Sequence, residues 1–241
     1  MPTVLVTGAN RGLGFEFTRQ YAAEGWTVIA CCRTPSKADA LQSLAKANSS
    51  VRIEKLDVDD DKNILALAKK LETVAIDVLI NCAGIFSGAG PNVPSTSGDE
   101  TQRFGSLDSA AWIKVLRTNT IGPVMVAQAF QNHLMKGKGH KLIMISSSMG
   151  SIERMDSEGD IAYRTSKAAL NAAARNISLS LLDKDITVVC LHPGWVRTDM
   201  GGEGADLTPE DSVSSMRRTI AGLKPQDTGH FFTYDVQVLP W

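Results

Sequence analysis

The chain has 241 residues, of which 43% are hydrophobic and 21% are charged, and it contains 20 glycines and 9 prolines. This composition is ordinary for a globular protein and excludes a disordered, collagen-like or fibrous chain. The 25 lysines and arginines and the 26 aspartates and glutamates give a net charge of −1. A nearly neutral chain lacks the basic surface of nucleic-acid-binding proteins, so no nucleic-acid partner is expected.

The N-terminal sequence MPTVLVTGAN lacks the charged, apolar and cleavage regions of a signal peptide. No apolar run reaches the roughly 18–20 residues that a membrane helix requires. We therefore expect a cytoplasmic protein without a membrane partner. Four cysteines are too few for a disulfide scaffold, and their spacing matches no zinc site. No metal is expected either, because the histidines are scattered, at His133, His140, His192 and His230.

Short apolar runs alternate with longer amphipathic stretches along the chain. In chain order the pattern predicts a strand at 3–7, a helix at 15–24, a strand at 27–31, a helix opening at Pro35, a strand at 51–56, a helix at 60–73, a strand at 76–81, helical structure at 107–135, a strand at 141–146, a helix at 160–182, a strand at 186–191, a helix at 209–222 and a strand at 230–234. Gly122-Pro123 is expected to kink the helical structure at 107–135.

The predicted strands are apolar without a two-residue alternation, which suits a sheet covered on both faces. Helices between the strands imply parallel pairing. We therefore predict an α/β fold, with one doubly wound domain over residues 1–241 and a mostly parallel sheet of seven strands. Residues 84–105 and 201–208 interrupt the alternation, and long loops inside a compact domain are usually functional or disordered.

The first predicted strand runs directly into a glycine-rich turn, Gly8-Ala9-Asn10-Arg11-Gly12-Leu13-Gly14, which opens a helix. Glycines let the backbone approach a pyrophosphate, and a helix N-terminus offers unpaired N–H groups to phosphate. The spacing is Gly-x-x-x-Gly-x-Gly, which differs from the standard dinucleotide fingerprint. A glycine-rich turn without a ligand is the alternative, but the position after the first strand favours dinucleotide binding.

The end of the second predicted strand indicates which dinucleotide binds. An acidic residue there would hold the ribose 2′-hydroxyl of NAD, whereas a cation would accept the 2′-phosphate of NADP. Arg33 follows the strand, no acidic residue precedes Asp39, and Arg11 is a second cation in the glycine-rich turn. The alternative is that both arginines are solvated surface residues. Because a guanidinium matches phosphate oxygens, the sequence favours NADP(H) over NAD(H).

Tyr163 and Lys167 are four residues apart in a predicted helix, so they share one face. A nearby ammonium favours the phenolate, so Lys167 is expected to lower the pKa of Tyr163 and to make the pair an acid/base. Ser147 follows a strand at the carboxyl edge where such sheets bind ligands, and its hydroxyl could hold a carbonyl. Because Ser146 and Ser148 flank it, a plain turn or helix cap is the alternative.

Five motifs occur in the order found in the short-chain dehydrogenase/reductase family, which the chain resembles over essentially its whole length. They are Thr7-Gly8-Ala9-Asn10-Arg11-Gly12-Leu13-Gly14, Asn81-Cys82-Ala83-Gly84, Ser147-x-x-Gly150, Tyr163-x-x-x-Lys167 and Pro193-Gly194-Trp195-Val196-Arg197-Thr198. The Tyr-Arg-Thr-Ser-Lys run and the ending Val238-Leu239-Pro240-Trp241 are most similar to the C-factor-like and sniffer-like carbonyl reductases. The resemblance implies a Rossmann fold that binds a nicotinamide dinucleotide.

The resemblance also implies roles for individual residues. Tyr163 would be the general acid/base and Lys167 its partner, also bonded to the nicotinamide ribose. Ser147 would orient the carbonyl, and Asn119 would hold a water in a proton relay. The residues expected to bind or frame the cofactor, with Asp57 at the adenine and Asn81 in a structural role, are Gly8, Asn10, Arg11, Gly12, Leu13, Gly14, Arg33, Asp57, Val58, Asn81, Ala83, Gly84, Tyr163, Lys167, Pro193, Gly194, Val196 and Thr198.

Two features depart from the family pattern. Cys82 stands where the family usually has asparagine, which is a mild change. Ser147 lies 16 residues before Tyr163, a longer spacing than is usual, because a polar insertion occupies residues 153–159. The insertion leaves open which serine of 146–148 points inward, and we predict that it is Ser147.

Together these residues predict NADPH-dependent, reversible reduction of a ketone or aldehyde by hydride transfer, with Tyr163 as the general acid. The alternative is a nucleotide-binding regulatory or signalling protein of the C-factor type, in which reductase activity is incidental.

The small-molecule carbonyl substrate is expected to contact residues 84–105, 152–160 and 201–222, which no general motif constrains. Relatives often form dimers or tetramers, so a homodimer or homotetramer is expected through residues 107–135 and 160–182. The alanines of the second segment could equally pack on the sheet.

Overall fold

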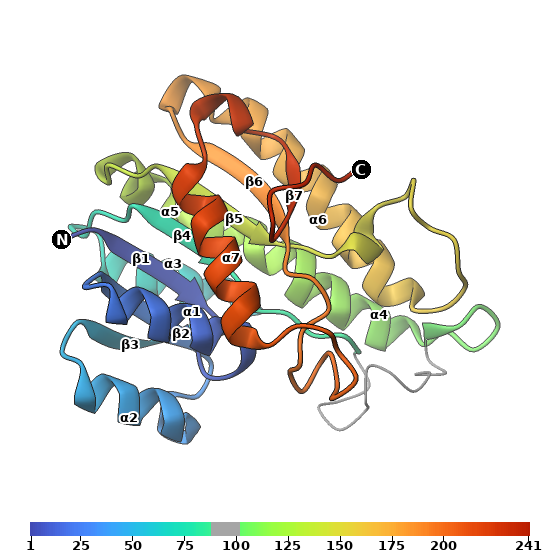
Figure 1. Cartoon of the computed structure of the whole chain (residues 1–241), viewed down its shortest axis with the longest axis horizontal. Coiled ribbons are helices and arrows are strands. Elements are labelled where there is room, and N and C mark those ends of the chain that lie inside the picture. The colour runs from blue at the N-terminus through green and yellow to red at the C-terminus, as the bar shows by residue number, and fades with distance from the viewer. Residues whose placement is uncertain (88–101) are drawn as a thin grey trace.

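The computed structural model describes residues 1–87 and 102–241. Its centre is a sheet of seven strands, all parallel, in the order β3-β2-β1-β4-β5-β6-β7 (Figure 1). The strands are β1 (Thr3–Thr7), β2 (Thr27–Cys32), β3 (Val51–Lys55), β4 (Val78–Asn81), β5 (Lys141–Ile145), β6 (Thr187–His192) and β7 (Phe231–Thr233). The strand order reverses between β1 and β4, which confirms the predicted doubly wound fold.

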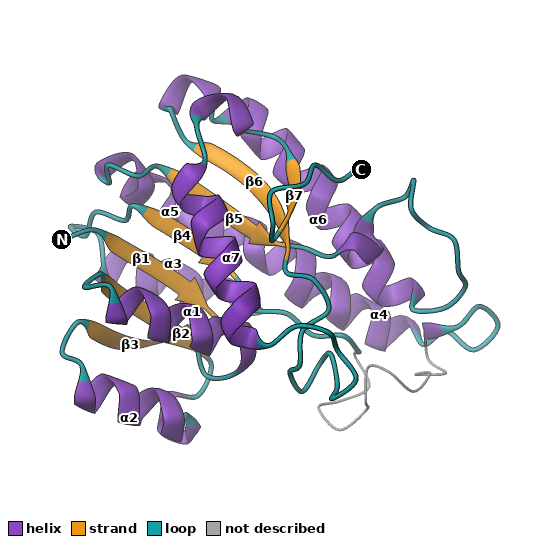
Figure 2. Cartoon of the chain, viewed as in Figure 1, coloured by secondary structure: helices purple, strands orange, loops and turns teal. Residues whose placement is uncertain are grey.

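Helices cover both faces of this sheet (Figure 2). The α-helices are α1 (Gly12–Ala23), α2 (Asp39–Ala47), α3 (Asp61–Lys70), α4 (Ser109–Leu116), α5 (Gly122–Lys136), α6 (Ile161–Ser180) and α7 (Pro209–Gly222). Buried side chains of α1, α2 and α7 pack on one face of the sheet. Those of α3, α5 and α6 pack on the other.

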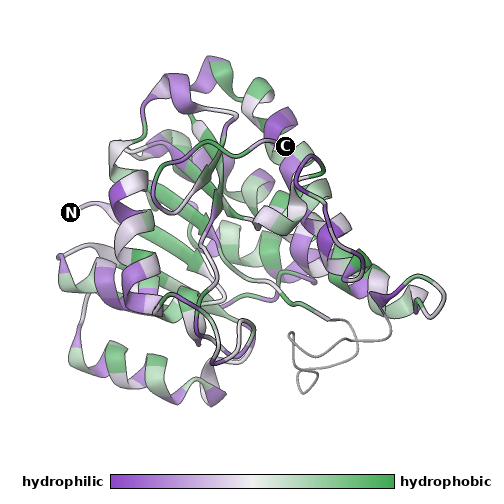
Figure 3. Cartoon of the chain, turned by 45° about the vertical axis from the view of Figure 1, so that its right-hand side comes forward, coloured by the Kyte–Doolittle hydropathy of each residue, from purple (hydrophilic) through white to green (hydrophobic). Residues whose placement is uncertain are grey.

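Both faces of the sheet are apolar. Val4 and Val6 of β1 lie in the cluster under α1 and α7, whereas Leu5 between them lies in the cluster under α5 and α6. Each side chain of this kind contributes about 1.5–3 kcal/mol when fully buried. Figure 3 shows the strands as hydrophobic, with hydrophilic residues on the outer helices. This double burial explains why the strand sequences show no polar–apolar alternation.

Two predicted helices differ in detail from the structure. Pro35 opens a short 3-10 turn (Pro35–Lys37), and α2 begins only at Asp39. The helical segment 107–135 consists of α4, a π-helical turn (Arg117–Ile121) and α5. The expected kink takes the form of this π turn, because Pro123 has no N–H to donate to the carbonyl four residues earlier.

The segments expected to contact the substrate are only partly described. Residues 88–101 lie outside the described residues, so the prediction for 84–105 is untested there. Residues 152–160 form a loop before α6, and residues 201–208 form a loop before α7. Figure 1 shows both loops on the side to which the strands point. The rest of the predicted segment 201–222 is α7 itself.

The alanine-rich face of α6 does not pack on the sheet as a whole. Ala174 belongs to the core, whereas Ala168 and Ala173 are half-buried and Ala172 is exposed. These alanines are therefore partly accessible to a second copy of the chain. The expected homodimer or homotetramer stays a prediction. Within residues 1–87 and 102–241, no helix has both the length and the apolar character needed to cross a membrane.

Candidate active site

The glycine-rich turn between β1 and α1 is packed so tightly that side chains would not fit. A Cβ at Gly8 would lie 2.9 Å from the Cα of Ala83, and one at Gly14 would lie 2.3 Å from the carbonyl oxygen of Gly8. Gly8 and Gly12 have positive φ values, of 69° and 54°, a region that favours glycine. At the end of β1 the turn therefore exposes backbone atoms that no side chain covers.

The first turn of α1 has features that suit an anionic ligand. Arg11 occupies the N-cap position but forms no side-chain capping bond, and no acidic residue lies in the first turn. The unpaired N–H groups of such a helix end bind phosphate. The strand order reverses between β1 and β4, next to this helix end. Because sheets of this type bind ligands at such a reversal, the glycine-rich turn and the start of α1 fit the pyrophosphate of a dinucleotide.

A threonine that the sequence analysis placed in a motif without a role of its own connects the ends of β1 and β4. The Thr7 hydroxyl accepts hydrogen bonds from the N–H groups of both Cys82 and Ala83, each at 3.0 Å. Asn81 is buried, and its amide nitrogen donates to the Pro123 carbonyl at 3.2 Å. These bonds support the structural role expected of Asn81, and they hold Ala83 beside the glycine-rich turn.

A cavity of about 350 Å³ lies between the start of α1 and the loop after β6, with Gly12, Arg11 and Thr198 among its lining residues. A Cβ at Gly12 would contact the Thr198 methyl group at 3.6 Å. Arg11 forms an exposed ion pair with Asp199 at 2.7 Å across this cavity. The ion pair thus connects Arg11 to the loop between β6 and α7.

The other predicted cofactor residues lie at the carboxyl edge of the sheet. Arg33 follows β2, is exposed, and forms no hydrogen bond or ion pair with its side chain in the described parts of the chain. Asp57 and Val58 follow β3, and the Asp57 carboxylate accepts a bond from the Asp59 N–H at 3.1 Å. The remaining residues surround the turns after β1 and β6: Asn10 is exposed, Leu13, Pro193 and Gly194 are half-buried, and Val196 is buried.

Tyr163 lies in the first turn of α6, and its side chain is buried beside Phe86, with ring centroids 4.7 Å apart. Burial raises the pKa of Tyr163 to about 12, a hydrogen bond with the Ser147 hydroxyl acts in the opposite direction, and Asp160 adds to the rise. The sequence predicts a lowered pKa instead. That direction is wrong for this structure, because removing the phenol from water disfavours its charged form.

The serine facing Tyr163 is Ser147, as predicted. The Ser147 hydroxyl acts to lower the pKa of the phenol, accepts a bond from the Met149 N–H at 3.2 Å, and precedes a short 3-10 turn, Ser148–Gly150. Ser146 faces away, since its hydroxyl donates to Asn171 at 2.6 Å. The glycine of the Ser-x-x-Gly motif also has a physical reason, because a Cβ at Gly150 would lie 2.7 Å from the Cβ of Lys167. Gly150 therefore lets the serine turn pack directly on α6.

Lys167 is buried one helical turn from Tyr163. Its ammonium donates to the Ile145 carbonyl at 2.9 Å and lies 5.8 Å from the centroid of the Tyr163 ring. Burial lowers the pKa of Lys167 to about 8, and Cys82 and Cys190 act in the opposite direction. A lysine with this pKa exchanges its proton near neutral pH.

The side chain of Asn119 hydrogen-bonds both to α6 and to the segment that follows β4. It lies in the π turn and is fully buried. Its side-chain oxygen accepts from the Ile85 N–H at 2.8 Å, and its amide donates to the Ile85 carbonyl at 2.8 Å and to Ser166 at 3.0 Å. Gly84 packs against it, since a Cβ there would lie 3.2 Å from that oxygen. The structure thus places Asn119 beside α6, near Lys167.

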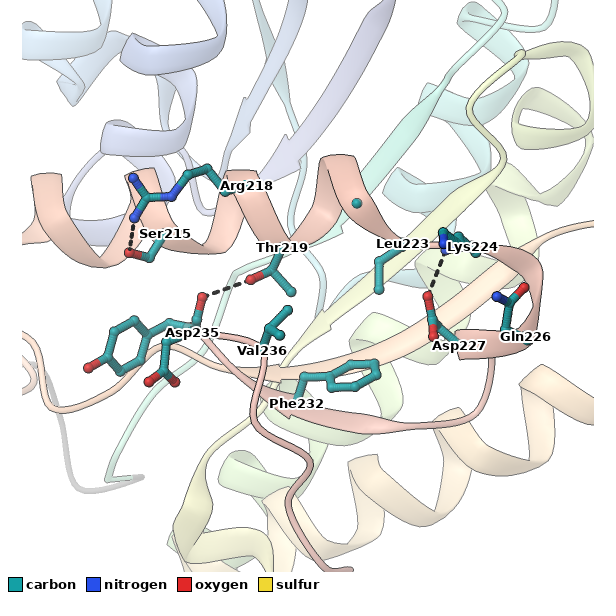
Figure 4. A pocket seen from close by; sticks show the side chains of 12 residues that line it. Ser215, Arg218, Thr219, Leu223, Lys224, Gln226, Asp227, Phe232, Asp235 and Val236 are labelled. Carbon is teal, nitrogen blue, oxygen red and sulfur yellow. Dashed lines mark hydrogen bonds between the residues drawn. The ribbon is translucent and has the colours of Figure 1, made fainter.

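A larger cavity, of about 560 Å³, lies away from these residues, between α7 and the segment around β7 (Figure 4). Arg218, Lys224, Asp227 and Asp235 line it together with Phe232. None of the predicted catalytic residues is among its lining residues.

Comparison with known proteins decides the family. A model of the short chain dehydrogenase family matches residues 2–206. The chain belongs to that family. The chain is therefore an oxidoreductase of the short-chain dehydrogenase type.

Three relatives show which members of the short-chain dehydrogenase family it is similar to. C-signal of Myxococcus xanthus is 39% identical over 73% of this chain and 99% of its own. The structure of the carbonyl reductase Sniffer of D. melanogaster aligns with 100% of this chain and over 100% of its own length, with 33% sequence identity and a TM-score of 0.90. An NADPH-bound carbonyl reductase from chicken fatty liver covers 100% of this chain and 94% of its own at 34% identity, with a TM-score of 0.85. These likenesses confirm the predicted resemblance.

Proposed function

We propose that the protein is an NADPH-dependent reductase that converts a ketone or aldehyde to an alcohol, reversibly. The observation that carries this proposal is the grouping of Ser147, buried Tyr163 and buried Lys167 at the sheet edge that also holds the glycine-rich turn. The structural likeness to carbonyl reductases, one of them solved with NADPH bound, supports it.

In this proposal the bound nicotinamide supplies the hydride that attacks the carbonyl carbon. Ser147 and Tyr163 donate hydrogen bonds to the carbonyl oxygen and stabilise the negative charge that develops there. Tyr163 then gives its proton to that oxygen. A pKa of about 12 keeps the phenol protonated at neutral pH, which suits a proton donor in the direction of reduction.

Lys167 resupplies the proton that Tyr163 gives up. Its pKa of about 8 lies close to the pH at which the enzyme works, which favours efficient proton transfer. Asn119 packs beside the same helix through Ser166 and would hold the water that continues the relay.

The test is turnover of NADPH with a panel of ketones and aldehydes. Replacing Tyr163→Phe removes one hydroxyl and keeps the ring, so we expect the reduction rate to fall by about 10²–10⁴-fold while NADPH still binds. Tyr234, a half-buried tyrosine directly after β7 that lines the larger cavity, provides the matched control: Tyr234→Phe should keep full activity. Full activity of Tyr163→Phe would refute the proposed role of the phenol.

A nucleotide-binding regulatory protein is the second candidate, because C-signal is among the relatives. The same variant separates the two candidates. If Tyr163→Phe rescues the phenotype of cells that lack the gene, although the variant has no turnover, the regulatory role is favoured. If only the active protein rescues that phenotype, catalysis is the function.

A further inference from the structure

The first turn of α6 needs a hydrogen-bond acceptor from outside the helix. The first four N–H groups of an α-helix have no partner within it, and in α6 the Tyr163 N–H is one of them, because the first internal bond runs from Arg164 to the Asp160 carbonyl. The missing acceptor comes from 61 residues earlier in the chain. The side-chain oxygen of Gln102 accepts from the Tyr163 N–H at 2.9 Å.

Gln102 is held in one orientation. Its side chain is 1% exposed, and turning its amide over would bring two donors together at Tyr163. The amide nitrogen is therefore fixed on the other side, where it is buried and has no hydrogen-bond partner in the described parts of the chain. A buried, unpaired donor is destabilising, so stability alone does not explain a glutamine here.

The choice of a neutral acceptor is informative. Helix N-termini favour carboxylates, because negative charge interacts well with the helix dipole. A carboxylate at position 102 would cap α6 at least as well, but it would put negative charge against the backbone of Tyr163, the residue whose phenol is proposed to face a developing oxyanion. Asp160 at the helix start already raises the pKa of Tyr163, and a second carboxylate would add to it.

We infer that Gln102 is a positioning residue for the proposed catalytic tyrosine: its amide fixes the Tyr163 backbone without adding charge next to that residue. The inference rests on the proposed function for its catalytic consequence. The charged groups around Tyr163 on α6 are Asp160, Arg164 and Lys167, and Arg103 follows Gln102 in the chain.

Two substitutions separate the bond from the charge. Gln102→Glu keeps the acceptor and introduces a group that can ionise. Gln102→Met keeps the size and removes the acceptor. Arg103→Ala, an exposed neighbour, is the control and should behave as wild type.

We expect Gln102→Glu to fold and to bind NADPH as wild type does, but to lose reduction rate as rising pH ionises the new carboxyl. Two like unit charges within roughly 10 Å of each other in a partly buried site change a rate by about 10–100-fold. Lowering the pH protonates the new carboxyl and should restore the rate. Gln102→Met should lower kcat without changing KM for NADPH. A Gln102→Glu enzyme with the wild-type rate and pH profile would overturn the inference, as would a loss proportional only to the unfolded fraction.

A second measurement does not depend on turnover. The Tyr163 amide should exchange its hydrogen faster in Gln102→Met than in wild type, and should stay protected in Gln102→Glu. Equal protection in all three proteins would overturn the positioning role. If wild type reduces no carbonyl compound but the exchange pattern holds, the proposed function fails and the placement of Tyr163 by Gln102 stands.

Discussion

Tyr163 and Lys167 are both buried, and burial moves their pKa values in opposite directions. It raises that of the phenol to about 12 and lowers that of the ammonium to about 8. Both shifts favour the neutral form, because a charge is costly away from water. The pair therefore starts with a protonated donor and a lysine that exchanges its proton readily.

The first prediction concerns the pH dependence of reduction. If protonated Lys167 resupplies the proton, the wild-type rate should fall as the pH rises through about 8, where the lysine loses its proton. Lys167→Arg should be slower at every pH, but its rate should not fall in that range, since a guanidinium stays charged. The measurement is kcat for reduction against pH. A wild-type rate that is unchanged across this range would exclude Lys167 as the source of the proton.

The second prediction concerns the cofactor. Arg33 is exposed and its side chain has no ion-pair or hydrogen-bond partner within the described residues, whereas Arg11 is paired with Asp199. A charge-assisted bond to phosphate is worth about 1.5–3 kcal/mol. Arg33→Ala should therefore lower kcat/KM for NADPH by about 10–100-fold and leave that for NADH nearly unchanged.

Arg218→Ala, an exposed arginine at the larger cavity, is the control for that experiment. It should not change the preference between the two cofactors. Equal rates of the wild-type enzyme with NADPH and NADH would contradict the argument from Arg33.

Residue chemistry was predictable where a motif fixes it, and Ser147, Tyr163 and Lys167 lie together as expected. The direction of the Tyr163 pKa was not, because it depends on burial that no local pattern reveals. Gln102 was missed for a similar reason. It lies far from Tyr163 in the sequence, and an isolated glutamine carries no motif.

At the scale of elements, the glycine-rich turn makes the β1–α1 connection possible. The third prediction tests it. Gly14→Ala places a methyl group where only 2.3 Å separates it from the Gly8 carbonyl oxygen. We expect a loss of about 1–3 kcal/mol in the free energy of unfolding, measured by denaturant titration, and weaker NADPH binding.

Gly222→Ala provides the matched control, because nothing lies within 4 Å of a Cβ there. That variant should keep both stability and NADPH affinity. Unchanged NADPH affinity in a folded Gly14→Ala protein would show that the close packing of the turn is not needed for binding.

Strands were predicted more closely than helix ends. Burial on both faces gives β1, β5 and β6 a clear apolar signature. By contrast, the π turn at Arg117–Ile121 depends on how α4 and α5 pack around Pro123. The sequence indicates that a distortion occurs there, but not its form.

At the scale of the whole molecule, the strand order brings distant residues to one edge of the sheet. Gly8, Ala83 and Ser147 follow β1, β4 and β5, which are neighbours in the sheet. Strand–helix alternation and motif order were enough to predict this arrangement. The substrate was not predictable, because the loops after these strands carry no general motif.

The most direct test of the account is transfer of label from the cofactor to the product. NADPH carrying two deuterium atoms at C4 of the nicotinamide should give an alcohol with one deuterium on the former carbonyl carbon, detected by mass spectrometry. We predict labelled alcohol with the wild-type enzyme and almost none with Tyr163→Phe under the same conditions. Alcohol without label, or equal labelling by both proteins, would contradict hydride transfer assisted by Tyr163.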